Sequence, residues 1–369
     1  MKNYRVLAIT DRSDLPETEL FIRLRQSGVD IEVACNPTGR YHPRLEKSGI
    51  IFYPLILKTR FSPGGMREIR KILNRKIYDI IYCFNNHATS NLILSRAGRT
   101  AKVVTYRGMV GNINFFSPAS WTTHLNPRVN RIICVCRAVR DYLNAMRWMG
   151  MKFSPGRAVA IYKGHDLAWY QDAPADLSEF GISENDFVVT FAGRDRPHKG
   201  AHVIVESAKF LPPELPVHFI LMGKISENRK LIHQINESPL RHRIHLLGFR
   251  NDAPAVISAG DVFVMPSTKR EGLSRAVIEA MCYGIPPIVT NVGGLPELVT
   301  DKESGFVIPP SDPRALARAI IDLYENPETR KRLGENARVR IRTHFNINTT
   351  VEQTRKVFEE LMAEEKQGI

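Results

Sequence analysis

The chain has 369 residues, of which 43% are hydrophobic and 24% are charged. This length exceeds what a single hydrophobic core usually serves, so we expect two domains. The composition is typical of a water-soluble globular protein, and no apolar run approaches the ~20 residues that a membrane-spanning helix requires. Charge appears too early in the first residues for a signal peptide, so we expect a cytoplasmic protein.

The formal net charge of +14 lies in the first half of the chain. Residues 1–172 hold 27 Lys and Arg against 12 Asp and Glu, whereas the remainder is nearly neutral. Such a surface attracts anions: nucleic acid, lipid headgroups or phosphorylated small molecules. Nucleic acid is not expected, because this half lacks helix-turn-helix and aromatic–basic patterns. Two interpretations stay open, an anionic partner or a charged face that only maintains solubility.

Short runs rich in Val and Ile alternate with segments of helical spacing, which is typical of parallel α/β sheets covered on both faces. In the first half this pattern predicts seven strands, at residues 4–10, 31–36, 50–55, 79–84, 102–106, 131–136 and 158–162. A polar stretch without strand pattern follows. The second half predicts six strands, at residues 187–193, 218–223, 244–249, 262–267, 286–290 and 305–309.

We therefore expect an α/β protein with two Rossmann-like, doubly wound domains. The first would span residues 1–170 and the second residues 171–349, with a C-terminal helix at about 350–369 that packs back on the first domain. Ligands of such sheets bind beyond the carboxyl ends of the strands. Function should therefore lie in strand-to-helix loops, which would face a central cleft.

The most informative segment is residues 266–299, PSTKREGLSRAVIEAMCYGIPPIVTNVGGLPELV. It predicts a strand end, a loop and a helix at about 274–283. Free backbone N–H groups at a helix start bind anions, so Gly272, Leu273 and Ser274 form a candidate diphosphate site.

Two glutamates accompany this helix start. Glu279 lies about two turns into the helix, where its carboxylate can accept hydrogen bonds from two ribose hydroxyls. Glu271 lies in the loop and would reach a sugar, either its hydroxyls or positive charge that develops at the anomeric carbon. Taken singly, Glu279 is equally typical of a solvated helix face and Glu271 of a carboxylate that complements the helix dipole.

Two basic residues, Arg194 and Lys199, follow the predicted strand 187–193 and precede a helix. Their positions predict that both lie at the edge of the sheet where ligands bind. Cations there can neutralise a departing diphosphate. This charge is the main catalytic demand when a glycosyl–phosphate bond breaks.

Together these motifs resemble the retaining glycosyltransferases of family 4, also called group 1, which have the two-domain GT-B fold. Their hallmark is a pair of glutamates separated by seven residues, followed by a Gly-Gly-Pro-Glu-like turn, here GGLPE at residues 293–297. The resemblance includes FAGRDRPHKGAHVIVESAKFL with its basic pair, and IYKGHD, in which Gly164 matches a linker motif. It spans about residues 158–345.

The resemblance implies that a sugar moves from a UDP- or GDP-linked donor to a saccharide or lipid-linked acceptor, with retained configuration, in surface polysaccharide or lipopolysaccharide biosynthesis. It implies catalytic roles for Glu271, Arg194 and Lys199, and donor binding by Glu279, Gly272, Leu273, Ser274 and Gly164. Many sugar transferases use a metal held by an Asp-x-Asp motif, which this sequence lacks. We therefore expect no metal and no cofactor.

The first half departs from the family motifs. The loop TDRSDLPETEL lacks the usual Gly-Gly, and Arg107 stands where many members carry a histidine close to the transferred sugar. Arg107 is either a contact for an anionic group of acceptor or donor, or a surface residue. His87 is either a general base or a loop histidine with its hydrogen bonds satisfied.

The stretch MREIRKILNRK, residues 66–76, combines basic and apolar residues. It is either a helix that lies on an anionic membrane surface, which would make the protein peripheral on the membrane, or an amphipathic helix packed on the sheet. Two other functions stay open. One is a nucleotide-sugar 2-epimerase of similar fold, and the other is a degenerate protein that only binds a sugar nucleotide.

Overall fold

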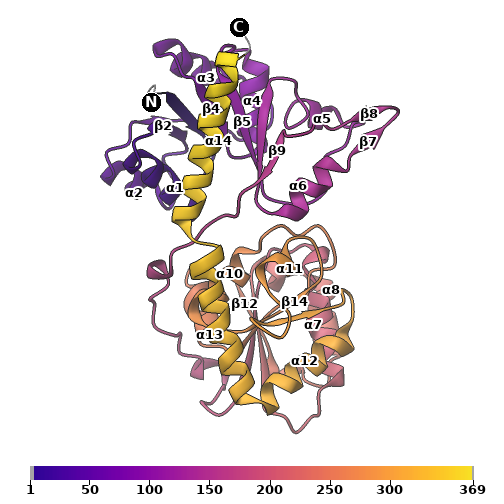
Figure 1. The fold of residues 1–369 in the computed structure, drawn as a ribbon. Helices are drawn as coiled ribbons and strands as arrows, with labels where there is room; N and C mark the ends of the chain where they lie inside the picture. The colour runs from indigo at the N-terminus through magenta and orange to yellow at the C-terminus, as the bar shows by residue number, and fades with distance from the viewer. Residues whose placement is uncertain (1–3, 368–369) are drawn as a thin grey trace. The chain divides into compact units, whose positions relative to one another are not determined.

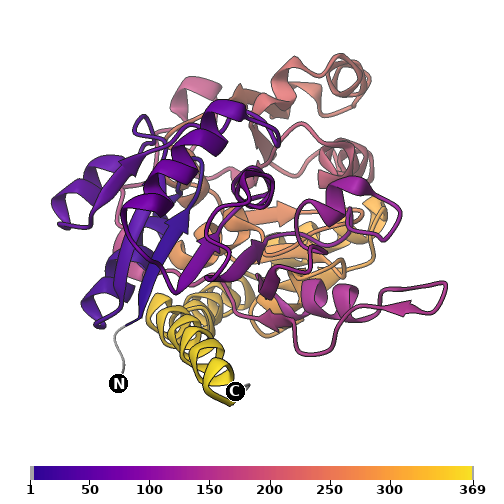
Figure 2. The same ribbon diagram turned by 90° about the horizontal axis from the view of Figure 1, so that it is seen from above.

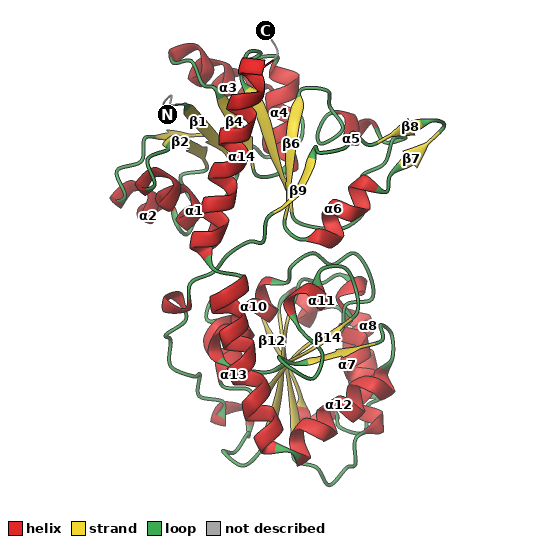
Figure 3. Cartoon of the chain, in the orientation of Figure 1, coloured by secondary structure: helices red, strands yellow, loops and turns green. Residues whose placement is uncertain are grey.

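The computed structural model of the protein describes residues 4–367, with side chains up to residue 364. The chain divides into two compact units (Figure 1): the first runs to Gly164 and resumes at Asn346, and the second is His165–Phe345. Each unit contains a parallel sheet with helices on both faces (Figure 3), which confirms the doubly wound α/β prediction. Among the described residues, no helix is both long and apolar enough to cross a bilayer.

The sheet of the first unit has seven parallel strands in the order β3-β2-β1-β4-β5-β6-β9, so all seven predicted strands are present. The order reverses between β1 and β4, as in nucleotide-binding sheets. Their bounds are β1 Arg5–Ile9, β2 Asp30–Cys35, β3 Phe52–Pro54, β4 Ile80–Cys83, β5 Lys102–Arg107, β6 Val129–Cys134 and β9 Ala158–Ala160.

The helices of this unit cover both faces of its sheet. They are α1 Leu15–Gln26, α2 His42–Lys47, α3 Pro63–Arg75, α4 Asn86–Ser95, α5 Pro118–Trp121, α6 Arg137–Asn144 and α14 Ile347–Gln367. Helix α14, yellow in Figure 2, packs against α1, and Arg23 donates a hydrogen bond to Asn348 at 2.6 Å. The last two residues of the predicted C-terminal helix, 368–369, lie outside the described part.

Helix α3 carries the basic stretch that the sequence left with two interpretations. Its apolar residues Met66, Ile69 and Ile72 are buried. The helix therefore packs on its own unit, and the alternative in which its apolar face lies on a membrane is wrong. A short antiparallel hairpin, β7 Arg147–Trp148 and β8 Met151–Lys152, was not predicted, because two-residue strands are too short to show a period.

The sheet of the second unit has six parallel strands in the order β12-β11-β10-β13-β14-β15, and these are the six predicted strands. Their bounds are β10 Phe187–Ala192, β11 Val217–Met222, β12 Ile244–Gly248, β13 Val262–Met265, β14 Pro287–Thr290 and β15 Phe306–Ile308. The α-helices are α7 Ala201–Ser207, α8 Arg229–Asn236, α9 Ala253–Ser258, α10 Arg275–Tyr283, α11 Leu295–Leu298, α12 Pro313–Glu325 and α13 Pro327–His344. The 3₁₀ turns are η1 Leu167–Trp169, η2 Ser178–Phe180, η3 Pro197–Lys199, η4 Ala208–Phe210, η5 Lys224–Glu227 and η6 Arg241–Arg243.

Candidate active site

In the second unit the strand order reverses between the neighbours β10 and β13, and the loops after these strands carry most of the predicted site residues. The two loops are bonded to each other, because the backbone N–H of Thr268 donates to the carbonyl of His198 at 2.8 Å. Gly200 lies so close to the second loop that a Cβ would stand 1.9 Å from the carbonyl oxygen of Pro266. In doubly wound sheets this reversal is where ligands bind.

The centre of this site is an ion pair between Lys199 and Glu271. The ammonium Nζ of Lys199 lies 2.9 Å from Oε1 and 2.7 Å from Oε2 of Glu271, and Ser267 donates a hydrogen bond to Oε2 at 2.8 Å. Glu271 is only 6% exposed, so these partners replace hydrogen bonds to water that its carboxylate loses on burial. The carboxylate is thus held in one orientation. The ammonium of Lys199 has a third N–H, which can donate a hydrogen bond to a ligand.

The loop after β14 lies in close contact with the backbone of Glu271. Gly294 donates its N–H to the carbonyl of Glu271 at 3.3 Å, and a Cβ on Gly293 would lie 2.0 Å from that same oxygen. Gly293 also has a φ of 58°, where a side chain is strained. The glycine pair of the GGLPE turn therefore sets the position of Glu271.

We expect Gly293→Ala to displace Glu271 and to destabilise the protein. The left-handed φ costs about 1–2 kcal/mol, and the clash with backbone adds about 1–3 kcal/mol. Gly181→Ala is the matched control, because Gly181 has a φ of 69° but open space around its Cβ. Thermal unfolding of both variants measures the difference, and equal losses of stability would contradict the proposed contact.

The start of α10 presents backbone donors beside this ion pair. Among the described residues, the N–H groups of Gly272, Leu273 and Ser274 make no hydrogen bond. Ser274 is the N-cap residue with extended backbone, and its side chain does not cap the helix. Free donors at a helix start, where the helix dipole is positive, are an arrangement that can bind an anion.

Two more predicted residues lie on the same two strand-to-helix segments. Glu279 is buried in α10, where Oε1 lies 3.2 Å from Nε of the exposed Arg275 one turn earlier. Arg194 is exposed in the loop after β10, and no other described residue forms a hydrogen bond or ion pair with its guanidinium. The structure thus brings Arg194, Lys199 and Glu271 to adjoining loops.

Three cationic or basic neighbours were missed in the sequence analysis, although RDRPHK and KR are visible in it: Arg196, His198 and Arg270. Burial lowers the pKa of His198, and Lys199 adds to this shift, so the imidazole is neutral near pH 7. Arg270 has a φ of 60°, which is uncommon for a residue with a side chain. Of these three residues, Arg196 and Arg270 add positive charge to that of the predicted pair, and the neutral His198 does not.

Arg107 stands at the end of β5 in the first unit and is only 7% exposed, so the surface interpretation is wrong. Its Nε donates to the carbonyl of Met109 at 3.0 Å, and its Nη2 donates to the carbonyl of Gly111. Burial lowers the pKa of Arg107 to about 10, and Arg60 adds to the shift. The guanidinium is still charged at neutral pH, and no carboxylate of the described residues pairs with it.

His87 lies in the first turn of α4, at the carboxyl end of the neighbouring β4. Its Nδ1 is 3.1 Å from the carbonyl oxygen of Leu57. A carbonyl can only accept, so Nδ1 carries the proton and Nε2 is the nitrogen that can accept one. His124 lies nearby, bonded to Thr105 and Asn86, and burial together with the surrounding arginines lowers its pKa to about 3. His124 is therefore a neutral structural residue.

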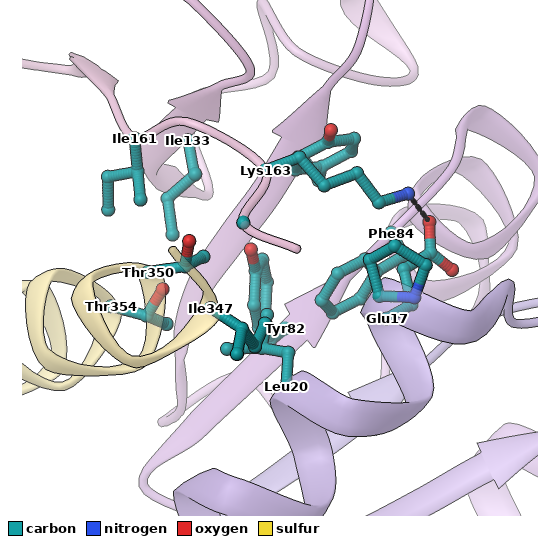
Figure 4. A pocket seen from close by; sticks show the side chains of 13 residues that line it. Glu17, Leu20, Tyr82, Phe84, Ile133, Ile161, Lys163, Ile347, Thr350 and Thr354 are labelled. Carbon is teal, nitrogen blue, oxygen red and sulfur yellow. Dashed lines mark hydrogen bonds and ion pairs between the residues drawn. The ribbon is translucent and has the colours of Figure 1, made fainter. Parts of the chain in front are cut away.

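The first loop, which lacks the family's glycines, forms an ion-pair cluster instead. Lys163 donates to Asp14 at 2.5 Å and to Glu17 at 3.2 Å, the latter drawn in Figure 4. Burial disfavours the ammonium, but the two carboxylates outweigh it and raise the pKa of Lys163. The cavity beside this cluster has a volume of about 10 Å³, which is room for one water and far too small for a sugar nucleotide.

Gly164 has a packing reason for being glycine. A Cβ there would lie 2.4 Å from Oγ1 of Thr350 and 2.5 Å from the carbonyl oxygen of Asn346, at the start of α14. Thr350 also donates to the carbonyl of Tyr162 at 2.7 Å. The close crossing with α14 explains this residue, and its donor contact stays a prediction.

Comparisons with known proteins show the family to which the two units belong. Residues 172–340 match the family model described as Glycosyl transferases group 1, and residues 18–169 match Glycosyltransferase Family 4. The UDP-Gal:alpha-D-GlcNAc-diphosphoundecaprenol alpha-1,3-galactosyltransferase of Escherichia coli is 27% identical over 376 residues, which cover 96% of this chain and 94% of that protein.

Solved structures share the fold. A glycosyltransferase from Rickettsia africae has a TM-score of 0.80 at 18% identity, covering 98% of this chain and 99% of its own. HepE of Anabaena in complex with UDP and glucose has a TM-score of 0.76 at 23% identity, covering 97% and 100%. The two parallel-sheet units have the GT-B architecture, and the chain belongs to the group 1, or family 4, glycosyltransferases.

Proposed function

We propose that this enzyme transfers a sugar from a nucleotide-diphosphate sugar, with retained anomeric configuration, to a lipid-linked saccharide in the synthesis of a cell-surface glycan. The observation that carries the proposal is the Lys199–Glu271 pair, which stands at the strand reversal beside three free backbone N–H groups. This arrangement provides fixed positive charge and a fixed carboxylate at one place, which is what departure of a diphosphate from an anomeric carbon needs.

In this proposal the diphosphate lies against Gly272, Leu273 and Ser274, with Arg194 and Lys199 as its cations. Arg194 is exposed and can close on the ligand, whereas Lys199 is already held in place by Glu271. The buried carboxylate of Glu279 accepts hydrogen bonds from ribose hydroxyls. Glu271 faces the sugar, where its charge stabilises positive charge that develops at the anomeric carbon.

The acceptor side of the proposal rests on the first unit. The Escherichia coli relative, as named, uses UDP-galactose and a GlcNAc-diphosphoundecaprenol acceptor. HepE was crystallised with UDP and glucose. A diphosphate-lipid acceptor is anionic, and Arg107 is a buried cation at the carboxyl end of β5 that pairs with no carboxylate of the described residues. We assign Arg107 to an anionic group of the substrates and His87 to the acceptor hydroxyl.

A transfer assay tests the proposal. The protein is incubated with UDP-galactose, UDP-glucose, UDP-GlcNAc and GDP-mannose in turn, with a short-chain GlcNAc-diphosphate lipid, and products are analysed by mass spectrometry and anomeric NMR. We expect one donor to yield an extended lipid with the α configuration of the donor. Hydrolysis or epimerisation of a donor without any extended lipid, or inversion, would contradict the proposal.

Transfer is expected to proceed without a divalent metal, because in the proposed site Arg194 and Lys199 neutralise the leaving group. The same assay with an excess of EDTA should retain at least half of the rate measured with Mg²⁺ or Mn²⁺. A rate that is lost with EDTA and restored by one added metal would show that the cations of the protein are insufficient.

A further inference from the structure

The ribbon of the β7–β8 hairpin extends beyond the sheet of the first unit (Figure 1), and its turn carries an exposed apolar residue, Met149. Its register pairs Arg147 with Lys152 and Trp148 with Met151, which leaves Met149 and Gly150 as a two-residue turn. Met149 is 82% exposed. A surface hairpin of this kind would ordinarily carry polar residues in the turn.

The backbone conformation of this turn is unusual for a methionine. Met149 and Gly150 have φ angles of 43° and 79°, so both turn residues are left-handed, as in a type I′ turn. The first position of such a turn favours Asn, Asp or Gly, because other side chains are strained there. Met149 therefore carries a local conformational cost, and little of its side chain is buried in return.

Two aromatic residues, Phe116 and Trp148, accompany Met149. Phe116, which is 67% exposed, packs its ring on Trp148 with 4.3 Å between ring centroids. We call Phe116, Trp148 and Met149 the hairpin patch. Exposed Arg147 and Lys152 flank its turn. Of the seven Lys and Arg in residues 115–157, Arg131 pairs with Glu364 and Arg140 with Asp141, so Arg147 and Lys152 are the cations that flank the turn itself.

We propose that the hairpin patch inserts into the interface of an anionic lipid bilayer. Aromatic and methionine side chains bury at the boundary between headgroups and acyl chains, while Lys and Arg beside them pair with anionic headgroups. Helix α3 does not supply this contact, because its apolar face is buried in its own unit. The inference extends the proposed function, since a lipid-linked acceptor lies in a membrane.

The variant Met149→Asn combined with Phe116→Ser tests the patch. Asn suits the left-handed turn, so the hairpin should form at least as well, and the melting temperature should be unchanged or higher. The matched control is Ile77→Asn, because Ile77 is 81% exposed on the same unit but lies outside the patch. Sedimentation with vesicles of pure phosphatidylcholine, or with 30% phosphatidylglycerol added, measures binding.

We expect the wild type and Ile77→Asn to bind the anionic vesicles, and the double variant to bind about tenfold or more weakly. Sugar transfer to a detergent-soluble short-chain acceptor should be unchanged in all three proteins, which separates this inference from the proposed function. Equal vesicle binding by the double variant and the wild type overturns the inference. So does a wild-type dimer, seen by light scattering, that the double variant converts to a monomer, because the patch would then bind a second copy.

Discussion

Replacing Lys199 with alanine is expected to lower kcat/KM for sugar transfer by about 10²–10³-fold, the range found when one preorganised group that stabilises transition-state charge is removed. The ammonium is held 2.7–2.9 Å from both oxygens of Glu271 and would face the leaving diphosphate. The substitution therefore removes a cation and frees the carboxylate to rotate. Steady-state kinetics with the preferred donor and the short-chain acceptor measures the loss.

The same substitution leaves the buried Glu271 charge without its ion-pair partner, which costs about 3–5 kcal/mol of stability. A lower melting temperature is therefore expected and must be separated from the catalytic effect. The double variant Lys199→Ala, Glu271→Gln removes the unpaired charge and should recover much of the stability, but none of the activity. If this double variant transfers sugar within threefold of wild type, the pair is structural only.

Replacing Glu279 with alanine is expected to raise the KM for the donor by about 10- to 100-fold with a smaller effect on kcat. In the proposed donor site this carboxylate accepts hydrogen bonds from the ribose, and hydrogen bonds to a charged group contribute about 1.5–3 kcal/mol. The ribose remains bound in ground and transition states alike, so the loss should appear in binding.

Arg275→Ala is the matched control for Glu279→Ala. Arg275 is exposed and pairs with Glu279 across one helical turn, an interaction that contributes only about 0.3–0.5 kcal/mol. Its loss should leave the donor KM within about twofold. Similar KM increases in both variants would mean that the ion pair matters and that Glu279 does not bind the ribose directly.

The fold was predictable because the strands of both sheets are covered on two faces and appear as short apolar runs. All thirteen strands of the two parallel sheets were predicted from such runs. The β7–β8 hairpin was missed because two residues per strand carry no period. The burial of the α3 apolar face could not be decided from its sequence, since an amphipathic pattern is the same against a sheet and against a membrane.

The site could be predicted only where its geometry follows from the order of neighbouring elements along the chain. The loop before α10 follows from a strand, a loop and a helix in sequence, but the contact between Lys199 and Glu271 joins residues 72 apart. The hydrogen bond from Ser267 to Glu271 could not be predicted from the sequence, because serine is common at strand ends. From the sequence, Arg107 could be either a surface residue or a ligand contact. The structure shows that it is buried, with its guanidinium donating to carbonyl groups of its own loop.

Calorimetric titration of the wild-type protein with UDP, GDP, ADP and CMP in EDTA tests the central claim most directly, because it measures the donor site without the acceptor. The proposed site predicts that one nucleoside diphosphate binds without metal, and that CMP, which lacks the second phosphate, binds much more weakly. If none of the four binds, or if CMP binds as tightly as the diphosphates, the loops after β10 and β13 do not form the donor site proposed for them.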